Sequence, residues 1–224
     1  MIRIFDILFS SFSLVLFLPL LLAVILILKI TGEGEVFYLQ ERVGKDKKIF
    51  KLFKFATMIK DSPNIGTKTL TIKDDPRILP MGHFLRKYKI NELPQLLNVF
   101  IGQMSLIGPR PLTLDTFEQY SEKQKSILRS LSPGLSGVGS IYFRNEEDFL
   151  TDKNMSEEFY KNYILPYKAE LEIWFFYNKS IRTYFILIFI TVFAIFTNKI
   201  NFLELFFKNL PTPSSELKKL INNT

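Results

Sequence analysis

The chain has 224 residues, of which 47% are hydrophobic, and it carries a formal net charge of +7. This length allows one domain, or one domain with membrane elements, and the apolar fraction is high for a soluble protein but low for a polytopic one. Because the sequence has no cysteine, it has no disulfide, thiolate nucleophile or thiolate metal ligand. The single histidine, His83, excludes a zinc site built from several histidines.

The positive charge is concentrated in one part of the chain. Residues 41–92 hold 13 Lys or Arg against 6 Asp or Glu, so this window alone accounts for the net charge. A basic block that follows an apolar N-terminal segment suits anionic lipid headgroups or phosphate-bearing substrates. Nucleic acid is the alternative partner for a basic patch, but no nucleic-acid motif accompanies the charge, and we expect no such partner.

The N-terminal segment is long enough to cross a bilayer. Ile7 to Leu28 is a run of 22 uncharged residues, which as a helix is about 33 Å long at about 1.5 Å per residue. A cleaved signal peptide is the alternative, but the apolar run is too long and no small-residue cleavage site follows it. We therefore predict a membrane helix.

Pro19 lies near the middle of this run, where proline removes a helix hydrogen bond and bends the axis. Two shapes are open: a kinked spanning helix, or a helix that breaks at Pro19 and returns to the side it entered. Arg3 precedes the run, and Lys29 and the basic window follow it. Basic flanks on both sides favour the re-entrant shape, with both ends in the cytoplasm.

Apolar periodicity and turn residues predict the remaining elements. In chain order they are a turn and short strand over 31–40, a half-buried strand or short helix over 49–58, a loop over 60–76, helices over 82–89 and 91–102, an amphipathic helix over 115–131, a turn-rich loop over 132–137, a helix over 156–179 kinked or interrupted at Pro166, and an uncharged apolar stretch over 183–198. The last of these is short for a membrane span and suits an interfacial or buried helix.

The first candidate for chemistry is Asn91-Glu92-Leu93-Pro94. Asparagine is a favoured N-cap, proline is tolerated in a first helical turn, and the helix dipole favours an acidic residue there. A well-capped helix start explains the motif without any function. In the functional interpretation, Glu92 is kept ionised by the dipole and by cations such as Arg86 and Lys89, and it binds a metal ion, or attacks or positions a phosphate.

The second candidate is Gly108-Pro109-Arg110-Pro111. The two prolines restrict the backbone around Arg110, and a guanidinium held in one direction suits bidentate phosphate recognition. A surface turn with an incidental arginine is the alternative. Further candidate phosphate-binding cations are Arg42, Lys54, Arg77, Arg86 and Arg144. Most such charges lie on solvated surfaces, but Lys54 lies between Phe53 and Phe55, which favours a defined direction for its side chain.

These segments together resemble the bacterial sugar transferases, also called monotopic phosphoglycosyl transferases. The resemblance extends from Ile2 to about Tyr167 and is specific because several motifs occur in the same order and spacing. They are Phe5-Asp6-Ile7, Gln40-Glu41-Arg42-Val43-Gly44, Lys54-Phe55-x-Thr57-Met58, Asp75-Pro76-Arg77-Ile78, Glu92-Leu93-Pro94-Gln95-Leu96-x-Asn98-Val99 and Gly108-Pro109-Arg110-Pro111.

With this resemblance, we expect a helix-rich α/β monotopic membrane protein with a Pro-broken re-entrant N-terminal helix and a small cytosolic catalytic domain. The expected divisions are a re-entrant membrane helix over 1–30, a catalytic domain with interfacial amphipathic helices over 31–180, an apolar membrane-associated helix over 181–210 and a polar tail over 211–224. The expected location is the cytoplasmic face of the bacterial inner membrane.

The resemblance also implies an activity. The family transfers a sugar 1-phosphate from a UDP-sugar to undecaprenyl phosphate with Mg²⁺, which starts a surface polysaccharide such as capsule or lipopolysaccharide, or a glycoconjugate. Other glycan-assembly enzymes are candidate partners. In the family an Asp-Glu pair carries catalysis: the aspartate attacks the β-phosphate, the glutamate serves the metal, and the arginine of Pro-Arg-Pro helps to hold the nucleotide. On this chain the implied catalytic positions are Asn91 and Glu92, with Glu92 as metal ligand.

The sequence departs from the family at the centre of this mechanism. The nucleophilic aspartate is replaced by Asn91, an arginine by Ala56 and an aspartate by Gln103. Three outcomes are open: Glu92 acts as nucleophile, Glu92 and Mg²⁺ orient direct attack by the lipid phosphate, or the chain is an inactive membrane-bound homologue that binds nucleotide-sugar or lipid phosphate. The retained residues around Asn91 favour activity.

Overall fold

The computed structural model describes residues 1–65, 71–72, 74–144, 158–196 and 202–222. The chain forms two compact units. Unit 1 comprises Met1–Lys60 and Pro76–Gly137, and unit 2 comprises Asp61–Asp75 and Val138–Thr224. Unit 1 therefore contains Glu92 and every predicted phosphate-binding cation except Arg144. The expected helix-rich α/β class, with a long apolar N-terminal helix and small sheets, is confirmed.

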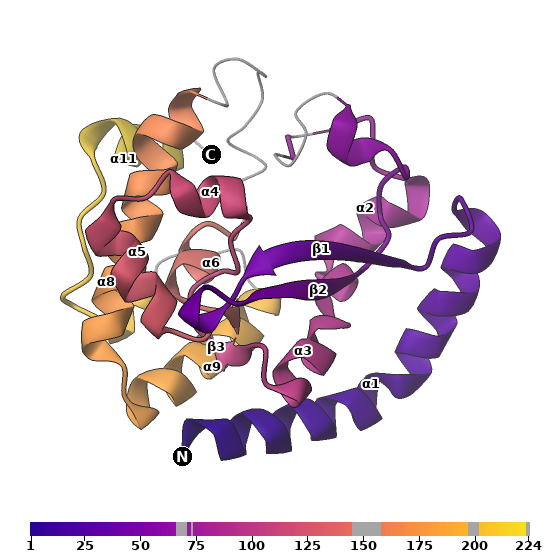
Figure 1. The fold of residues 1–224 in the computed structure, drawn as a ribbon, viewed down its shortest axis with the longest axis horizontal. Helices are drawn as coiled ribbons and strands as arrows, with labels where there is room; N and C mark the ends of the chain where they lie inside the picture. Colours follow the sequence, from indigo (N-terminus) through magenta and orange to yellow (C-terminus); the bar gives the residue numbers. More distant parts are fainter. Residues whose placement is uncertain (66–70, 73, 145–157, 197–201, 223–224) are drawn as a thin grey trace. The chain divides into compact units, whose positions relative to one another are not determined.

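Helix α1, Ile2–Thr31, opens unit 1. It is the one helix among the described residues that is long and apolar enough to cross a membrane. It continues as a helix on both sides of Pro19, so the expected break at this residue is not observed. Proline removes only one hydrogen bond, and the leucine-rich turns on either side keep the helix going. Figure 1 shows that α1 nevertheless changes direction along its length.

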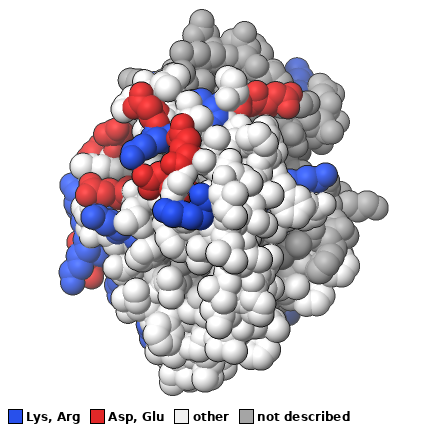
Figure 2. Space-filling view, turned by 90° about the vertical axis from the view of Figure 1, so that its right-hand side faces the viewer, with Lys and Arg blue, Asp and Glu red and all other residues white. Residues whose placement is uncertain are grey.

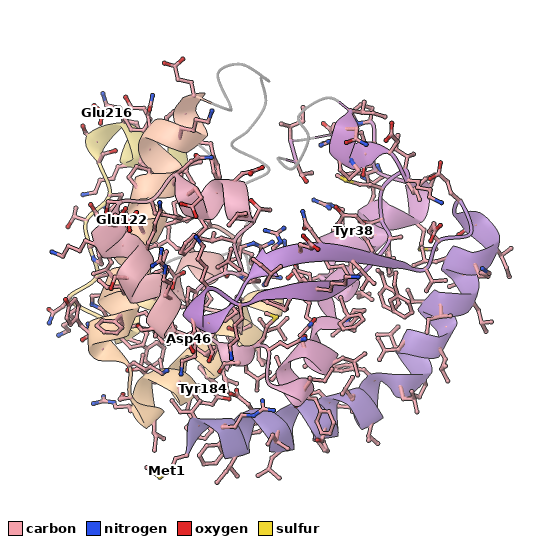
Figure 3. The ribbon with its side chains drawn as sticks, viewed as in Figure 1. Met1, Tyr38, Asp46, Glu122, Tyr184 and Glu216 are labelled. Atoms are coloured by element: carbon pink, nitrogen blue, oxygen red, sulfur yellow. The ribbon has the colours of Figure 1, made fainter. Side chains whose placement is uncertain are left out.

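The next element is an antiparallel hairpin of β1, Phe37–Val43, and β2, Ile49–Phe55. Its turn contains Asp46, which has a left-handed backbone (φ 56°) and is labelled at the end of the hairpin in Figure 3. The register pairs Tyr38 with Lys54 and Arg42 with Phe50. Since alternate residues of a strand share a face, Arg42 and Lys54 lie on the same face of the hairpin.

Helix α3, Gln95–Ile101, packs against β2 in unit 1 (Figure 1). Val99 of the helix and the following Met104 form a core cluster with Phe50 and Leu52. The fully buried Asn98 fastens α3 to the backbone of β2, because its Oδ1 accepts from the Phe53 N–H at 3.0 Å and its Nδ2 donates to the Lys51 carbonyl at 2.8 Å. These two bonds fix the position of β2 along α3, and therefore also the position of Lys54.

We expect Asn98→Ala to lower the free energy of unfolding by about 2–4 kcal/mol, because a donor and an acceptor of the β2 backbone lose their partner inside the protein. Denaturant unfolding in detergent measures this change. Asn98→Asp should keep the bond from Phe53 but place an oxygen against the Lys51 carbonyl, so it should not restore stability. A loss below about 0.5 kcal/mol for Asn98→Ala, as for an ordinary surface position, would contradict this role.

Ahead of α3 lie α2, Pro80–Lys87, and the 3₁₀ turn η3, Ile90–Glu92. The predicted end of the second helix at Gly102 is confirmed by a left-handed glycine there (φ 102°). Its predicted start at Asn91 is wrong. The left-handed Lys89 (φ 57°) turns the chain into η3, α3 begins only after Pro94, and Asn91 makes no capping bond.

Strand β3, Ser105–Ile107, pairs in parallel with β4, Gly134–Ser136, and leads directly to Gly108 and Arg110. The loop predicted over 132–137 thus contains a short strand, which local turn residues do not reveal. A side chain at Gly108 is excluded because its Cβ would lie 2.4 Å from the Ser132 carbonyl oxygen. This close approach holds the Pro-Arg-Pro turn against β4.

The helix predicted over 115–131 is two helices, α4, Leu114–Glu118, and α5, Glu122–Ser130. They are separate because Ser121 and Gln124 form a capping box that begins a new helix. Of the two alternatives over 49–58, strand or short helix, the structure has the strand, β2, and the helix predicted over 82–89 is confirmed as α2.

The elements that the structure describes in unit 2 are all helices or helical turns. Its elements are η2, Ser62–Asn64; α6, Val138–Tyr142; a π-helical turn η5, Tyr160–Ile164; α8, Leu165–Asn178; α9, Ile181–Phe196; α10, Phe202–Phe206; and α11, Ser215–Asn222. The described part of the helix predicted over 156–179 is η5 followed by α8, with Pro166 in the first turn of α8.

Helix α9 corresponds to the second apolar stretch. One of its faces is buried within unit 2 through Tyr184, Leu187 and Ile190, whereas Phe189 and Val192 are exposed. Its 16 residues are fewer than the roughly 20 that a membrane span needs. One buried face is typical of a helix that packs on its own domain, and the predicted association of α9 with a membrane stays a prediction.

Candidate active site

The centre of the candidate site is an ion pair between Glu92 of η3 and Arg110 of the turn after β3. Nη2 of Arg110 donates to Oε1 of Glu92 at 3.3 Å, and the two side chains are 46% and 17% exposed, respectively. The two motifs singled out from the sequence therefore meet in space. The carboxylate is mostly enclosed but reachable, and the guanidinium is open to solvent and can turn toward an anionic substrate.

The charge state of Glu92 follows from its surroundings. Burial would raise the pKa of this carboxyl, but Arg110, Lys54 and Lys89 act in the opposite direction and lower it to about 2. Glu92 is therefore ionised at any physiological pH. A carboxylate of such low basicity is suited to ligating a cation rather than to donating or removing a proton.

At Lys54, unlike at Glu92, the effect of burial on the pKa exceeds that of the opposing charge. Burial lowers the pKa of this ammonium group to about 7, opposed by Glu92 and assisted by the positive charges of Arg110, Arg42 and Arg86. The cations that act on Lys54 come from β1 (Arg42), α2 (Arg86) and the Pro-Arg-Pro turn (Arg110). These elements therefore concentrate positive charge around Lys54 and Glu92. A group that is half-charged near neutrality, surrounded by arginines, is stabilised in its charged form when an anion binds.

Arg42 also shapes the site through its hydrogen bonds. Its Nη1 donates to the carbonyl oxygen of Pro111 at 3.0 Å, and its Nη2 donates to Gln40. The neighbouring Val43 N–H donates to the Leu112 carbonyl at 2.9 Å. The end of β1 is thus bonded to both residues after Arg110, so this arginine supports the turn as well as contributing charge.

The other predicted cations differ in their placement. Arg86 of α2 belongs to the electrostatic surroundings of Lys54. Arg77 is 4% exposed, and its carbonyl accepts from the Ile59 N–H at 3.0 Å, so its substrate-binding role stays a prediction. Arg144 belongs to unit 2 and is not placed relative to Glu92.

Asn91 is buried beside Glu92 in η3, with 5% of its surface exposed. Its Oδ1 has no hydrogen-bond partner within the part of the chain that the structure describes. An unpaired buried amide oxygen is unfavourable unless something else binds it. Because Asn91 caps no helix, the explanation of this residue as a purely structural cap is excluded.

Two other positions, Gln103 and Ala56, also depart from the family pattern, and the structure explains only the first. Gln103 has a structural use, since its Oε1 accepts from Nδ2 of Asn98 at 2.7 Å, as a carboxylate oxygen could. Ala56 is buried, and nothing in the structure explains why a cation is missing there.

The acceptors present suit a magnesium ion only if a substrate supplies the remaining ligands. No cluster of three or more His, Cys, Asp or Glu side chains that could hold a metal occurs among the described residues. Mg²⁺ does not need one, since it is commonly bound by one or two carboxylates together with substrate phosphates and water. Ionised Glu92 and the unpaired amide oxygen of Asn91 are oxygen ligands of the required kind.

Asn98 is the residue of structural importance that sequence reasoning missed. The motif in which it occurs does not reveal its role in joining α3 to β2. The available signal was a polar residue on the apolar face of a predicted helix, between Leu96 and Val99. Such a pattern indicates a buried side chain that must find hydrogen-bond partners.

Unit 1 thus combines an apolar helix that is long enough to cross a membrane with a carboxylate enclosed by cations, and such a site suits phosphate-bearing substrates. The model of the family described as "Bacterial sugar transferase" matches residues 1–198. The chain therefore belongs to this family and is a sugar-phosphate transferase of the class that builds polysaccharides.

Individual relatives agree. The chain is 35% identical over 177 residues to the exopolysaccharide production protein ExoY of Rhizobium meliloti, covering 73% of this chain and 78% of that protein. It is 34% identical over 197 residues to the UDP-glucose:undecaprenyl-phosphate glucose-1-phosphate transferase of Escherichia coli, covering 87% of this chain but 40% of that enzyme. It is also 34% identical over 178 residues to the undecaprenyl-phosphate galactose phosphotransferase of Salmonella typhimurium, covering 73% of this chain and 37% of that enzyme.

Proposed function

We propose that this protein transfers a sugar 1-phosphate from a UDP-sugar to undecaprenyl phosphate, as the first step in making a surface polysaccharide or glycoconjugate. The activities by which the Escherichia coli and Salmonella relatives are named support these two substrates. The observation that carries the proposal for this chain is the Glu92–Arg110 pair among Lys54, Lys89 and Arg42. Two anionic substrates need such an excess of positive charge to approach one another.

The chemistry we propose is a direct displacement. An oxygen of the lipid phosphate attacks the β-phosphorus of the UDP-sugar, the bond from this phosphorus to the bridging oxygen breaks, and UMP leaves with the electron pair. Asn91 is an amide and cannot supply the nucleophile, and Glu92 is a weak one because its pKa is about 2. The lipid phosphate is already anionic, so the attack needs no general base.

In this proposal Arg110 and Lys54 hold the pyrophosphate, while Glu92 and the amide oxygen of Asn91 hold Mg²⁺. The ion would supply neutralisation of the charge on the pyrophosphate and the departing UMP. Glu92 cannot keep its full bond to Arg110 while it ligates a cation. Arg110, whose pair with Glu92 is partly open to solvent, would then be able to turn toward the substrate phosphates.

We propose that α1 enters the inner membrane and returns, so that unit 1 lies on the cytoplasmic face. The curvature of α1 in Figure 1 and the basic residues on both flanks support this shape. Exposed apolar side chains on or next to α2 and α3, including Phe84, Tyr88, Phe100 and Ile101, suit contact with the interface. Figure 2 shows a broad area without charged side chains on the side of the molecule where part of α1 lies.

The function is tested with purified protein in lipid nanodiscs that contain undecaprenyl phosphate, Mg²⁺ and a panel of UDP-sugars. Release of UMP with one or more UDP-sugars is expected. Absence of UMP across the panel, with nucleotide-sugar still bound, would favour the inactive binding homologue. Intact-protein mass spectrometry after addition of UDP-sugar without lipid should find no phosphosugar adduct, and an adduct on Glu92 would overturn direct displacement.

Binding of a UDP-sugar should also take up a proton. Because the pKa of Lys54 is about 7 in the free protein and a bound pyrophosphate raises it, Lys54 is mostly neutral before binding and charged after binding at pH 8. We expect uptake of nearly one proton at pH 8 and much less at pH 6, measured by calorimetry in buffers of different ionisation enthalpy. Affinity should fall as the pH rises above about 7. Lys54→Met should remove both effects, and equal uptake by this variant would contradict the assignment.

A further inference from the structure

A buried carboxylate near the start of α1 is bonded to the strand that leads to Arg110. Asp6 is 3% exposed, although it lies in a helix that is otherwise almost wholly apolar. Its Oδ1 accepts from Oγ of Ser105 at 3.0 Å and from the backbone N–H of Leu106 at 2.9 Å. A buried carboxylate is tolerated only where such donors satisfy it, so these bonds fix α1 at one level against β3.

One turn earlier on the same helix, Arg3 is bonded to the end of α3. Its guanidinium donates to the carbonyl of Val99 and, at 2.6 Å, to that of Phe100. A cation that binds the last carbonyls of a helix satisfies acceptors that have no partner within it and interacts favourably with its dipole. Gly102 leaves room for this contact, since a Cβ at this position would lie 3.1 Å from Nη2 of Arg3.

The residues that Arg3 and Asp6 contact lie between Glu92 and Arg110 in the chain. Helix α3 follows Glu92 in the chain, and β3 leads to Arg110. We propose that Arg3 and Asp6 are positioning residues that couple α1 to the active site, so that the depth of α1 in the bilayer sets the level at which Glu92 and Arg110 meet the lipid phosphate. This inference rests on the proposed function.

The coupling has a consequence that differs for the two substrates. A UDP-sugar arrives from water, and its contacts with Arg110 and Lys54 do not depend on the depth of the membrane helix. The lipid phosphate is confined to the headgroup region, so its encounter with the site depends on that depth. Loosening the coupling should therefore impair the use of the lipid far more than the binding of the nucleotide.

The test compares Asp6→Ala, Asp6→Asn and Ser105→Ala in anionic nanodiscs. Asp6→Ala should speed hydrogen exchange at the Leu106 amide by about tenfold or more and lower kcat/KM for undecaprenyl phosphate by about tenfold or more, with KM for the UDP-sugar within about twofold. Asp6→Asn keeps an oxygen acceptor and should recover most of both losses. Ser105→Ala removes one donor and leaves the Leu106 bond, so its effect should be smaller.

Ser10→Ala is the matched control. Ser10 is also buried on α1, one turn further along, but its hydroxyl donates to Ile7 of the same helix. This variant should behave like the unmodified protein. Unchanged exchange at Leu106 in Asp6→Ala, or equal losses for the two substrates, would overturn the proposal. If the unmodified protein releases no UMP, the proposed function fails instead, and the exchange of Leu106 by itself supports or overturns the coupling.

Discussion

Replacing Glu92 by glutamine should lower the rate of UMP release by about 10³-fold, while the protein remains folded. The exchange preserves size and shape but removes the negative charge that we propose binds Mg²⁺. It also leaves Arg110, Lys54 and Lys89 without the carboxylate that balances them. Loss of a charged group that acts on the transition state commonly reduces rates by about 10²–10⁴-fold. The measurement is UMP release in nanodiscs at saturating UDP-sugar and lipid.

Glu118→Gln provides the matched control, because this glutamate also forms ion pairs, to Lys47 at 3.0 Å and to Lys125 at 2.7 Å. It should change UMP release by less than about twofold, since its pairs join α4, α5 and the hairpin turn and do not include Glu92. Retention of more than about one-tenth of the activity by Glu92→Gln would show that this carboxylate is not the centre of the reaction.

Arg110→Lys should reduce kcat/KM for the UDP-sugar by about 10²-fold, because lysine keeps the charge but loses the planar pair of donors that phosphate recognition uses. Arg110→Ala should be at least as severe. The pKa of Glu92 should rise in Arg110→Ala, since Arg110 is the strongest of the cations that lower it. Steady-state kinetics over a range of UDP-sugar concentrations measures the effect.

Arg129→Lys is a suitable control for this substitution. Arg129 lies over the ring of Phe117 and supports the packing of α4 and α5. Its replacement should leave kcat/KM within about twofold of the original value. If Arg110→Lys retained full kcat/KM, charge alone would be sufficient, and the proposed fork-like recognition of the pyrophosphate would be wrong.

The identity of the individual catalytic groups can be probed further at Asn91. Asn91→Asp places a carboxylate where the amide oxygen of the natural residue has no hydrogen-bond partner among the described residues. If direct displacement operates in the natural chain, this variant should be the one in which a phosphosugar adduct becomes detectable by mass spectrometry. An adduct of equal abundance in the unmodified protein would contradict the absence of a covalent step.

Features of the fold that are set by residues close together in the sequence could be predicted from it. The apolar run of α1 follows from its composition, and the end of α3 at Gly102 follows from one glycine in a left-handed conformation, whereas the pattern over 49–58 left strand and short helix open. The start of α3 could not be predicted in this way. A capping motif at Asn91 was outweighed by the turn that Lys89 begins, so a strong local preference gave a wrong boundary.

The family, the long apolar helix and the two short motifs that carry Glu92 and Arg110 could all be recognised from the sequence, because they are properties of composition and spacing. Three features became visible only in the folded chain: Glu92 and Arg110 form a pair, Lys54 is directed at them from β2, and Asp6 is bonded to a strand 99 residues away. The physical reason is that burial and charge are shared between distant segments. The pKa of Glu92 depends on cations from three parts of the chain, and no local pattern records how closely folding brings them together.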